Sequence, residues 1–188
     1  MTDSTTVWNR ISLIRGDITT QPVDAIVNAA NSRLAGGGGV DGAIHRAAGP
    51  QMMDACRKIG GCPTGSAKLT PGFNLPARFV IHAVGPVYRD GLHGEPEALA
   101  SCYRTAIELA AENGCETVAF SAISCGIYGY PLEAAARVSI DAVAGALGPC
   151  DRPEKVWWVL FDERVHRAFA AALLESAGQD RHGVETPP

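Results

Sequence analysis

Apolar residues along the chain fall into short runs of strand length that alternate with longer stretches of helical spacing. The last run, from Val156 to Phe161, has no polar residues at alternate positions, which is typical of a strand covered on both faces. It therefore predicts a strand at or near the centre of a sheet. In all, strands are predicted over residues 11–15, 25–28, 78–84, 116–121 and 155–161.

The segments between these runs have the spacing of helices that pack one face on a sheet. Stripes of apolar residues at helical spacing begin at Leu99, Ala136 and Val165. Shorter helices are predicted over 41–48 and 51–58. Gly178 and the polar residues after it are expected to end the last helix. Strands that alternate with helices predict a largely parallel sheet with helices on both sides. The clearest stripe consists of Leu99, Cys102, Tyr103, Ala106 and Ala110.

Composition and charge narrow the function classes. The 188 residues are 46% hydrophobic and 19% charged, as in a globular domain, and the net charge of −4 argues against duplex nucleic acid as the main ligand. No apolar stretch approaches the roughly 18 residues of a membrane span, and the polar first residues lack the regions of a signal peptide. We therefore expect a cytoplasmic protein without membrane contact. The 6 cysteines show no CxxC pair or zinc spacing, which predicts reduced thiols and no metal.

Unusual residues follow the predicted strands at the ends where open α/β sheets bind ligands. Asp17 follows the first strand, and Asn31 precedes a run of glycines, 36–39, after the second. The segment 124–130 follows the fourth strand, and Phe161 ends the last one. If these strands are parallel, all of these loops share one edge of the sheet.

The two glycine-bearing segments have the chemistry of a phosphate site. Glycines let the backbone approach a ligand closely, and a helix that begins after residues 36–39 adds the positive end of its dipole. Gly126 and Gly129 give the second segment the same property. A flexible hinge is the alternative interpretation of the glycine run. A diphosphate held between the two segments is the ligand we expect.

Two familiar phosphate motifs do not account for these glycines. The sequence contains no GxxxxGK[ST], which argues against a P-loop NTPase. Gly37, Gly39 and Gly42 match GxGxxG, but the preceding strand ends near residue 28, too early for the tight turn of a dinucleotide-binding fold. No strand with a terminal acidic residue follows about 20 residues later, as that fold requires. A dinucleotide dehydrogenase is therefore disfavoured.

Several longer stretches carry a resemblance to a known family. They are GDIT at 16–19, DAIVNAAN at 24–31, LAGGGGVDGAIHRAAG at 34–49, CPTG at 62–65, VIHAVGP at 80–86 and GIYGYP at 126–131. On these motifs the chain resembles the macrodomains, and among them the MacroD-type ADP-ribosyl hydrolases. The resemblance covers about residues 11–175. It implies an α/β/α sandwich around a mixed, largely parallel six-stranded sheet, as a single domain over 1–177, with 1–6 and the tail 178–188 expected to be flexible.

The resemblance also implies a site for ADP-ribose, with no cofactor and no metal. Asp17 and the backbone of Ile18 would bind the adenine, and Phe161 either packs on it or is only the last core residue of its strand. Asn31 and Asp41 match the pair regarded as catalytic in this family. The other implied contacts are Gly37, Gly38, Gly39 and Val40 at the distal ribose, Ser124, Cys125, Gly126, Ile127 and Tyr128 at the diphosphate, and Tyr130 on the distal side.

Several of these residues also have a structural interpretation. Asn31 could satisfy its own turn, Asp17 could cap the turn after it, and Asp41 could cap a helix. His45 and His82 lie in apolar contexts and are interpreted as core histidines. Ser121 and Cys125 depart from the family pattern, in which Pro and Thr or Ser are common, and a space-filling role for Cys125 is favoured over a redox or nucleophilic one.

Two functions remain open at this point. In the first, the protein hydrolyses an ester at the distal ribose, removing mono-ADP-ribose from Asp or Glu side chains of proteins or deacetylating O-acetyl-ADP-ribose. Asp41 would orient or deprotonate the attacking water, or the diphosphate of the substrate would assist it. In the second, the protein is a non-catalytic reader of ADP-ribose. ADP-ribosylated proteins are the expected partners, and a monomer is expected.

Overall fold

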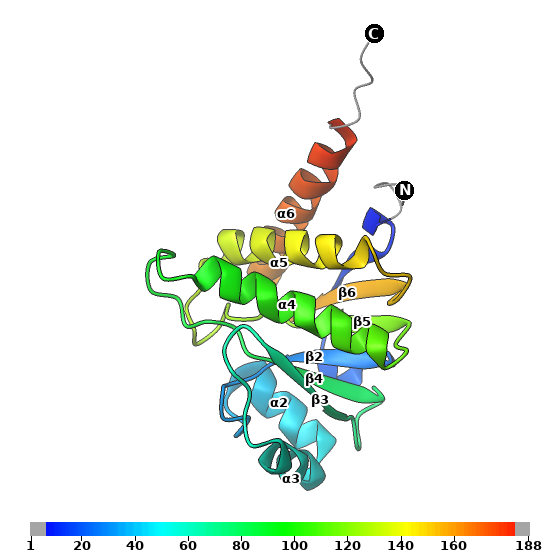
Figure 1. Ribbon diagram of the computed structural model, residues 1–188, viewed down its shortest axis with the longest axis vertical. Coiled ribbons are helices and arrows are strands. Elements are labelled where there is room, and N and C mark those ends of the chain that lie inside the picture. The colour runs from blue at the N-terminus through cyan, green and yellow to red at the C-terminus, as the bar shows by residue number, and fades with distance from the viewer. Residues whose placement is uncertain (1–6, 183–188) are drawn as a thin grey trace.

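One mixed sheet forms the centre of the computed structural model, which describes residues 7–182 (Figure 1). Its strand order is β1-β6-β5-β2-β4-β3. The expected flexibility of 1–6 and of the end of the tail concerns residues outside this range. The strands are β1 (Ile11–Arg15), β2 (Ala25–Ala29), β3 (Ala67–Pro71), β4 (Phe79–Ala83), β5 (Thr117–Phe120) and β6 (Lys155–Leu160).

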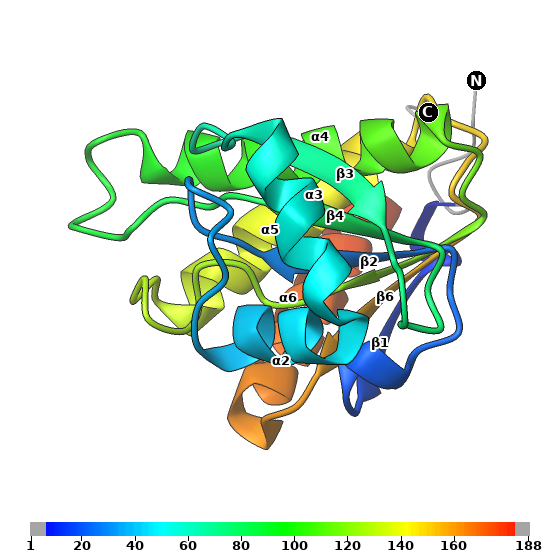
Figure 2. The ribbon, with the colours of Figure 1, turned by 90° about the horizontal axis from the view of Figure 1, so that it is seen from below.

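Helices cover both faces of this sheet, as the alternation of strands and helices predicts. One face packs against α4 (Glu95–Glu112), α5 (Leu132–Leu147) and α6 (Glu163–His182). The other packs against the short 3-10 helix η1 (Ile18–Thr20), α2 (Gly39–Ala48) and α3 (Pro50–Ile59). Figure 2, seen from below, shows α2 and α3 on the near side of the sheet. The three-layer sandwich is confirmed, and no described helix has the length and apolar character to cross a membrane.

Parallel pairing places the ends of five strands at one edge. β1 pairs with β6, β6 with β5, β5 with β2 and β2 with β4, all in parallel. Only β3 is antiparallel, to β4. The residue pattern did not predict β3, because this edge strand carries Lys68 and Pro71 and has little apolar content. An edge strand needs a partner on one side only and therefore tolerates proline.

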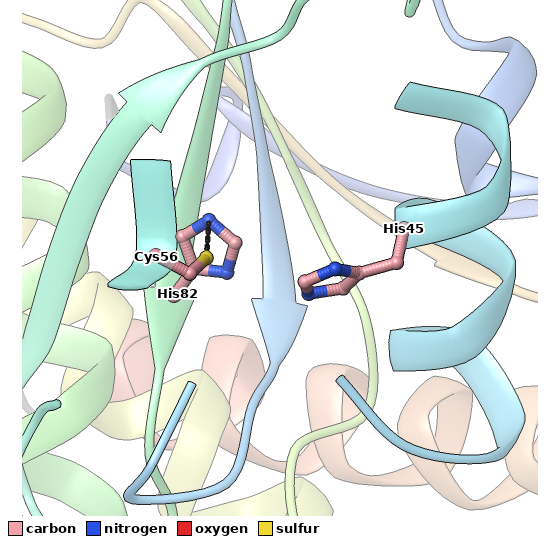
Figure 3. A group of neighbouring side chains, drawn as sticks. All are labelled: His45, Cys56 and His82. Atoms are coloured by element: carbon pink, nitrogen blue, oxygen red, sulfur yellow. Dashed lines mark hydrogen bonds between the residues drawn. The ribbon is translucent and has the colours of Figure 1, made fainter. Parts of the chain in front are cut away.

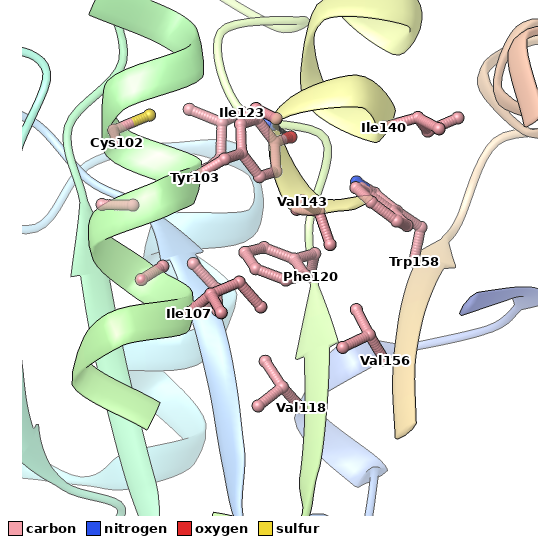
Figure 4. Close-up of a cluster of buried hydrophobic side chains, with 14 of the residues drawn as sticks. Cys102, Tyr103, Ile107, Val118, Phe120, Ile123, Ile140, Val143, Val156 and Trp158 are labelled. Atoms are coloured by element: carbon pink, nitrogen blue, oxygen red, sulfur yellow. Dashed lines mark hydrogen bonds between the residues drawn. The ribbon is translucent and has the colours of Figure 1, made fainter. Parts of the chain in front are cut away.

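Aromatic side chains fill the core between the sheet and α4 and α5 (Figure 4). The rings of Phe120 and Trp158 stack with centroids 5.3 Å apart, and Tyr103 lies 5.1 Å from Phe120. All three side chains are fully buried. Trp158 lies on one face of β6, and Val159 on the other face belongs to the core beneath α2 and α3, so the prediction of a strand covered on both faces is confirmed.

The last helix extends further than predicted. We expected Gly178 to end α6, but the helix continues to His182. Contacts with α5 hold its later turns: Ser176 Oγ donates to Asp141 Oδ1 over 2.6 Å, and Arg137 pairs with Glu175 at 2.9 Å. One glycine within a helix costs only about 1 kcal/mol relative to alanine, so anchored neighbouring turns can continue through it.

The aromatic cluster should carry a large share of the stability. Replacing Phe120 with alanine should lower the free energy of unfolding by about 3–5 kcal/mol, because it removes buried surface and leaves a cavity beside Trp158. Leu174→Ala, at a largely exposed position on α6, should change it by less than about 0.5 kcal/mol. Urea denaturation of both variants measures the difference. Similar losses in the two variants would contradict the assignment of the core.

Candidate functional site

Two glycine-bearing loops face each other at the carboxyl ends of the strands. The first runs from the end of β2 to the start of α2, and the second runs from the end of β5 to the start of α5. A side-chain carbon placed on Gly38 would lie 3.8 Å from Ile127 Cδ1 of the second loop. The expectation that both loops share one edge of the sheet is therefore confirmed.

The space between and beside these loops consists of two adjoining hollows. The smaller has a volume of about 200 Å³ and includes Asn31 and Asp41 in its wall. The larger has a volume of about 500 Å³ and includes Asp17 and Phe161. Both include the same segment of the first loop, Gly39 and Val40, together with Ala122 and Gly126 of the second. The hollows thus adjoin where the two loops meet and form one cleft.

The larger hollow contains a carboxylate and an exposed aromatic ring. Asp17 Oδ1 accepts hydrogen bonds from Thr19 N at 2.8 Å and Thr19 Oγ1 at 2.7 Å, so Asp17 does cap the turn that follows it. Its side chain also borders the hollow. Phe161 is 83% exposed and is therefore not a core residue of β6. A flat ring open to the cleft is available for stacking on a ligand.

Cys125 also lines the larger hollow. Burial raises the pKa of its thiol to about 12, so the sulfur stays protonated at neutral pH. A protonated thiol is a weak nucleophile and reacts slowly with oxidants. This supports the space-filling interpretation of Cys125.

Asp41 is the buried carboxylate of the smaller hollow. It is the third residue of α2, after the capping residue Gly38, so it does not cap the helix as the sequence allowed. Its Oδ1 accepts from Asn28 Nδ2 over 2.7 Å and lies 3.3 Å from His45 Nε2. A side-chain carbon on Gly37 would lie 3.2 Å from Oδ2. One carboxylate oxygen is thus held by the protein, and the other lies beside the glycine loop.

Asn31 holds the turn that leads into the glycine run. Its Nδ2 donates to Gly36 O over 2.9 Å, and its Oδ1 accepts from Ala35 N over 3.2 Å. Asn31 therefore does satisfy its own turn, as the structural interpretation expected. The side chain also borders the smaller hollow, and its contact with a ligand stays a prediction.

The second loop rests on the segment that follows β4. Ser124 Oγ donates to Pro86 O over 2.8 Å, and Tyr88 N donates to Tyr128 O over 2.9 Å. Tyr130 is only 3% exposed, and its ring lies 4.7 Å from that of Tyr88. Among the described residues, Tyr130 is not part of the wall of either hollow. Its backbone N–H donates to Ser124 O over 3.0 Å, so Tyr130 helps to hold the second loop, and its expected role at the distal side stays a prediction.

A buried carboxylate that the sequence analysis missed shapes this supporting segment. Glu95 accepts hydrogen bonds from the backbone N–H groups of Arg89 at 3.1 Å and His93 at 2.7 Å. Burial alone would raise the pKa of Glu95, but these donors lower it to about 2. Glu95 therefore stays ionised and fixes the turn that carries Tyr88 to the second loop.

The two histidines interpreted as core residues are indeed shielded from solvent: His82 is fully buried, and the side chain of His45 is 11% exposed. The sequence analysis missed that both also belong to the surroundings of Asp41. Asn28 on β2 pairs in register with His82 on β4, and Asn28 Nδ2 lies 3.2 Å from His82 Nδ1. Figure 3 shows His45 extending from α2 toward His82. The available signals were polar residues inside apolar strands and the i,i+4 spacing of Asp41 and His45.

His45, Cys56 and His82 have possible metal-ligand atoms within 4.8 Å of one another. However, both ring nitrogens of His82 have hydrogen-bonding neighbours, Asn28 at Nδ1 and Thr70 Oγ1 at 3.0 Å from Nε2. Burial, with a contribution from the charge of Asp41, raises the pKa of the Cys56 thiol to about 11. The chemistry of these donors fits a hydrogen-bonded network better than a metal centre.

The burial of His82 predicts a pH dependence of stability. Desolvation and the proximity of His45 lower the pKa of His82 to about 4, although Asp41 opposes this. In the unfolded chain the pKa is about 6.5, so between these values only the unfolded chain binds the proton. This contribution to stability is complete above about pH 6.5 and falls as the pH drops toward 4, by up to about 3 kcal/mol.

Urea denaturation of the wild type and of His82→Asn between pH 7 and 4.5 measures this contribution of His82 to the free energy of unfolding. The free energy of unfolding of the wild type should fall more steeply with decreasing pH than that of the variant. The comparison isolates His82, because the other titrating groups are common to both proteins. Parallel curves would contradict the account.

Comparison with known proteins places this geometry in a family. Residues 27–139 match the family model described as Macro domain. The chain is 56% identical over 163 residues to a macro domain-containing protein of Chlorobaculum tepidum, covering 87% of this chain and 95% of that protein. It is 48% identical over 175 residues to a protein of Escherichia fergusonii named O-acetyl-ADP-ribose deacetylase, covering 91% and 99%.

Solved structures agree with the sequence matches. An Oceanobacillus iheyensis macrodomain with ADP superimposes with a TM-score of 0.86 at 40% identity, covering 90% of this chain and 92% of that chain. A Trypanosoma brucei macrodomain in complex with ADP-ribose superimposes with a TM-score of 0.83 at 40% identity, covering 91% and 71%. This chain belongs to the macrodomain family.

Proposed function

We propose that this protein is a MacroD-type hydrolase that binds ADP-ribose and cleaves an ester at its distal ribose. The ester is either the bond to an Asp or Glu side chain of a protein or the O-acetyl group of O-acetyl-ADP-ribose. The observation that carries the proposal is the position of Asp41, a buried carboxylate in the wall of the smaller hollow. The relative named O-acetyl-ADP-ribose deacetylase supports the reaction class.

Backbone groups would provide most of the binding. The diphosphate would lie where the two loops meet, against Gly39, Val40 and Gly126, with the positive end of the α2 dipole directed toward it. The adenine would lie in the larger hollow, against Phe161 and the carboxylate of Asp17. The distal ribose would then extend into the smaller hollow. Binding of this kind needs no cluster of cationic side chains, which agrees with the net charge of −4.

The chemistry would depend on Asp41. Its Oδ1 already accepts from Asn28, so Oδ2 is the oxygen that would orient or deprotonate a water molecule. The water adds to the ester carbonyl carbon, the bond from that carbon to the ribose oxygen breaks, and the products are a carboxylic acid and a free ribose hydroxyl. General-base catalysis of this kind contributes about 10²–10⁴ to the rate. Assistance by the diphosphate of the substrate is compatible with the same geometry.

A reader module that binds ADP-ribose without cleaving it is the second candidate. The same cleft would serve it, but a reader has no need of a carboxylate buried at the distal end. Incubating the wild type with a Glu-ADP-ribosylated protein and with O-acetyl-ADP-ribose decides between the two. Hydrolysis of either ester supports the enzyme, whereas binding of free ADP-ribose without any release would support the reader.

Two substitutions should separate catalysis from binding. Asp41→Ala should reduce kcat at least about tenfold and leave the Kd for ADP-ribose within a few fold, because it removes a group that acts mainly in the transition state. Asp17→Ala should mainly raise the Kd, because this side chain borders the larger hollow. Calorimetric titration and steady-state kinetics measure both quantities. An equal loss of affinity in the two variants would remove the catalytic assignment of Asp41.

A further inference from the structure

A chain of buried polar side chains leads away from Asp41 into the protein. Asn28 Nδ2 lies 2.7 Å from Asp41 Oδ1 and 3.2 Å from His82 Nδ1. On the other side of the ring, His82 Nε2 lies 3.0 Å from Thr70 Oγ1. Thr70 Oγ1 in turn donates to Met52 Sδ over 3.3 Å. None of these four residues is more than 2% exposed. The chain crosses from β2 through β4 to β3 and ends on α3.

The charge of Asp41 fixes the direction of every hydrogen bond in this chain. A carboxylate only accepts, so the atom of Asn28 that faces it must be the amide nitrogen. The second hydrogen of that nitrogen points to His82 Nδ1, which must therefore be unprotonated. The ring proton of His82 is then on Nε2 and is donated to Thr70 Oγ1. The hydroxyl proton of Thr70 remains for Met52 Sδ.

The oxygen of the Asn28 amide, unlike its nitrogen, does not help to fix the orientation of the group. Asn28 Oδ1 is buried and has no hydrogen-bond partner within residues 7–182. The orientation of the amide therefore depends on its two N–H groups alone, one directed to Asp41 and one to His82. Removing the acceptor at His82 would leave a buried N–H without a partner, and the amide would turn to find another.

We propose that His82 is a positioning residue for the hydrolytic site, which acts through Asn28 to hold the carboxylate of Asp41 in place, with Thr70 accepting the ring proton of the tautomer that Asn28 requires. The proposal rests on the proposed function for its effect on turnover. Its effect on the Asn28 amide is independent of any substrate. His82 itself touches neither hollow among the described residues.

Two substitutions of His82 separate this role from simple packing. In His82→Asn, a carbonyl oxygen can replace Nδ1 and accept from Asn28. In His82→Gln, the longer side chain can replace Nε2 and reach Thr70, but it leaves Asn28 without its acceptor. Both variants remove the ring, so a merely structural role predicts similar effects in the two.

We expect His82→Gln to lower kcat at least about tenfold, which corresponds to about 1.4 kcal/mol in the barrier, with KM and the Kd for ADP-ribose within about twofold. His82→Asn should keep most of the wild-type kcat. Long-range ¹H–¹⁵N NMR of the wild type should show Nδ1 of His82 as the unprotonated nitrogen and Nε2 as the protonated one. Equal kcat values for the two folded variants, or a protonated Nδ1, would overturn the proposal.

Two substitutions of Thr70 disturb the core less and serve as the test if either His82 variant fails to fold. Thr70→Val removes the hydroxyl with little change in volume and should reduce kcat and mix the tautomers of His82, whereas Thr70→Ser should preserve both. An unchanged tautomer and kcat in Thr70→Val would contradict the role of this residue and of the chain.

The side-chain amide signals of Asn28 separate a failure of this proposal from a failure of the proposed function. They should move in His82→Gln and stay near their wild-type positions in His82→Asn. If the wild type hydrolyses neither ester, the proposed function is wrong, and these signals still decide the positioning role. Amide signals that are the same in all three proteins would overturn it.

Discussion

Parallel pairing of β2 with β4 and β5 is the constraint on which the site depends. It places the loops after β2 and β5 at one edge, where Ile127 lies against Gly38. The same register sets Asn28 opposite His82, so the pairing that positions the phosphate loops also builds the hydrogen-bonded support behind Asp41. A slip of one residue in either strand would turn its polar side chain to the other face of the sheet, away from its partner, and remove that support.

Among the described residues, the walls of the two hollows contain no lysine or arginine, so the start of α2 is the positive feature of the cleft. The protein carries a net charge of −4, yet the N-terminal residue of α2, Gly39, is part of the wall of both hollows, where the positive end of the helix dipole would favour the diphosphate that we propose. Asp41 lies in the first turn of the same helix, where the dipole favours a negative charge, and Asn28 donates to it. In the function that we propose, one helix terminus would thus favour both the diphosphate and the carboxylate that acts at the distal ribose.

The sequence predicted most of the architecture, because apolar periodicity reports directly on burial. The five strands it predicted occur at the expected places, whereas the edge strand β3 lacked the apolar run needed to identify it. The convergence of the glycine loops followed from strand order alone. The packing of Tyr130 on Tyr88 and the chain of polar side chains that starts at Asp41 could not be predicted, because they depend on contacts between strands and loops far apart in sequence.

A crystal structure with bound ADP-ribose tests the central claim most directly. The account predicts the diphosphate between the backbone of Gly38–Val40 and that of residues 124–127, with the distal ribose within reach of Asp41 Oδ2 directly or through one water molecule. A diphosphate bound away from these two loops, or a distal ribose directed out of the smaller hollow, would contradict it.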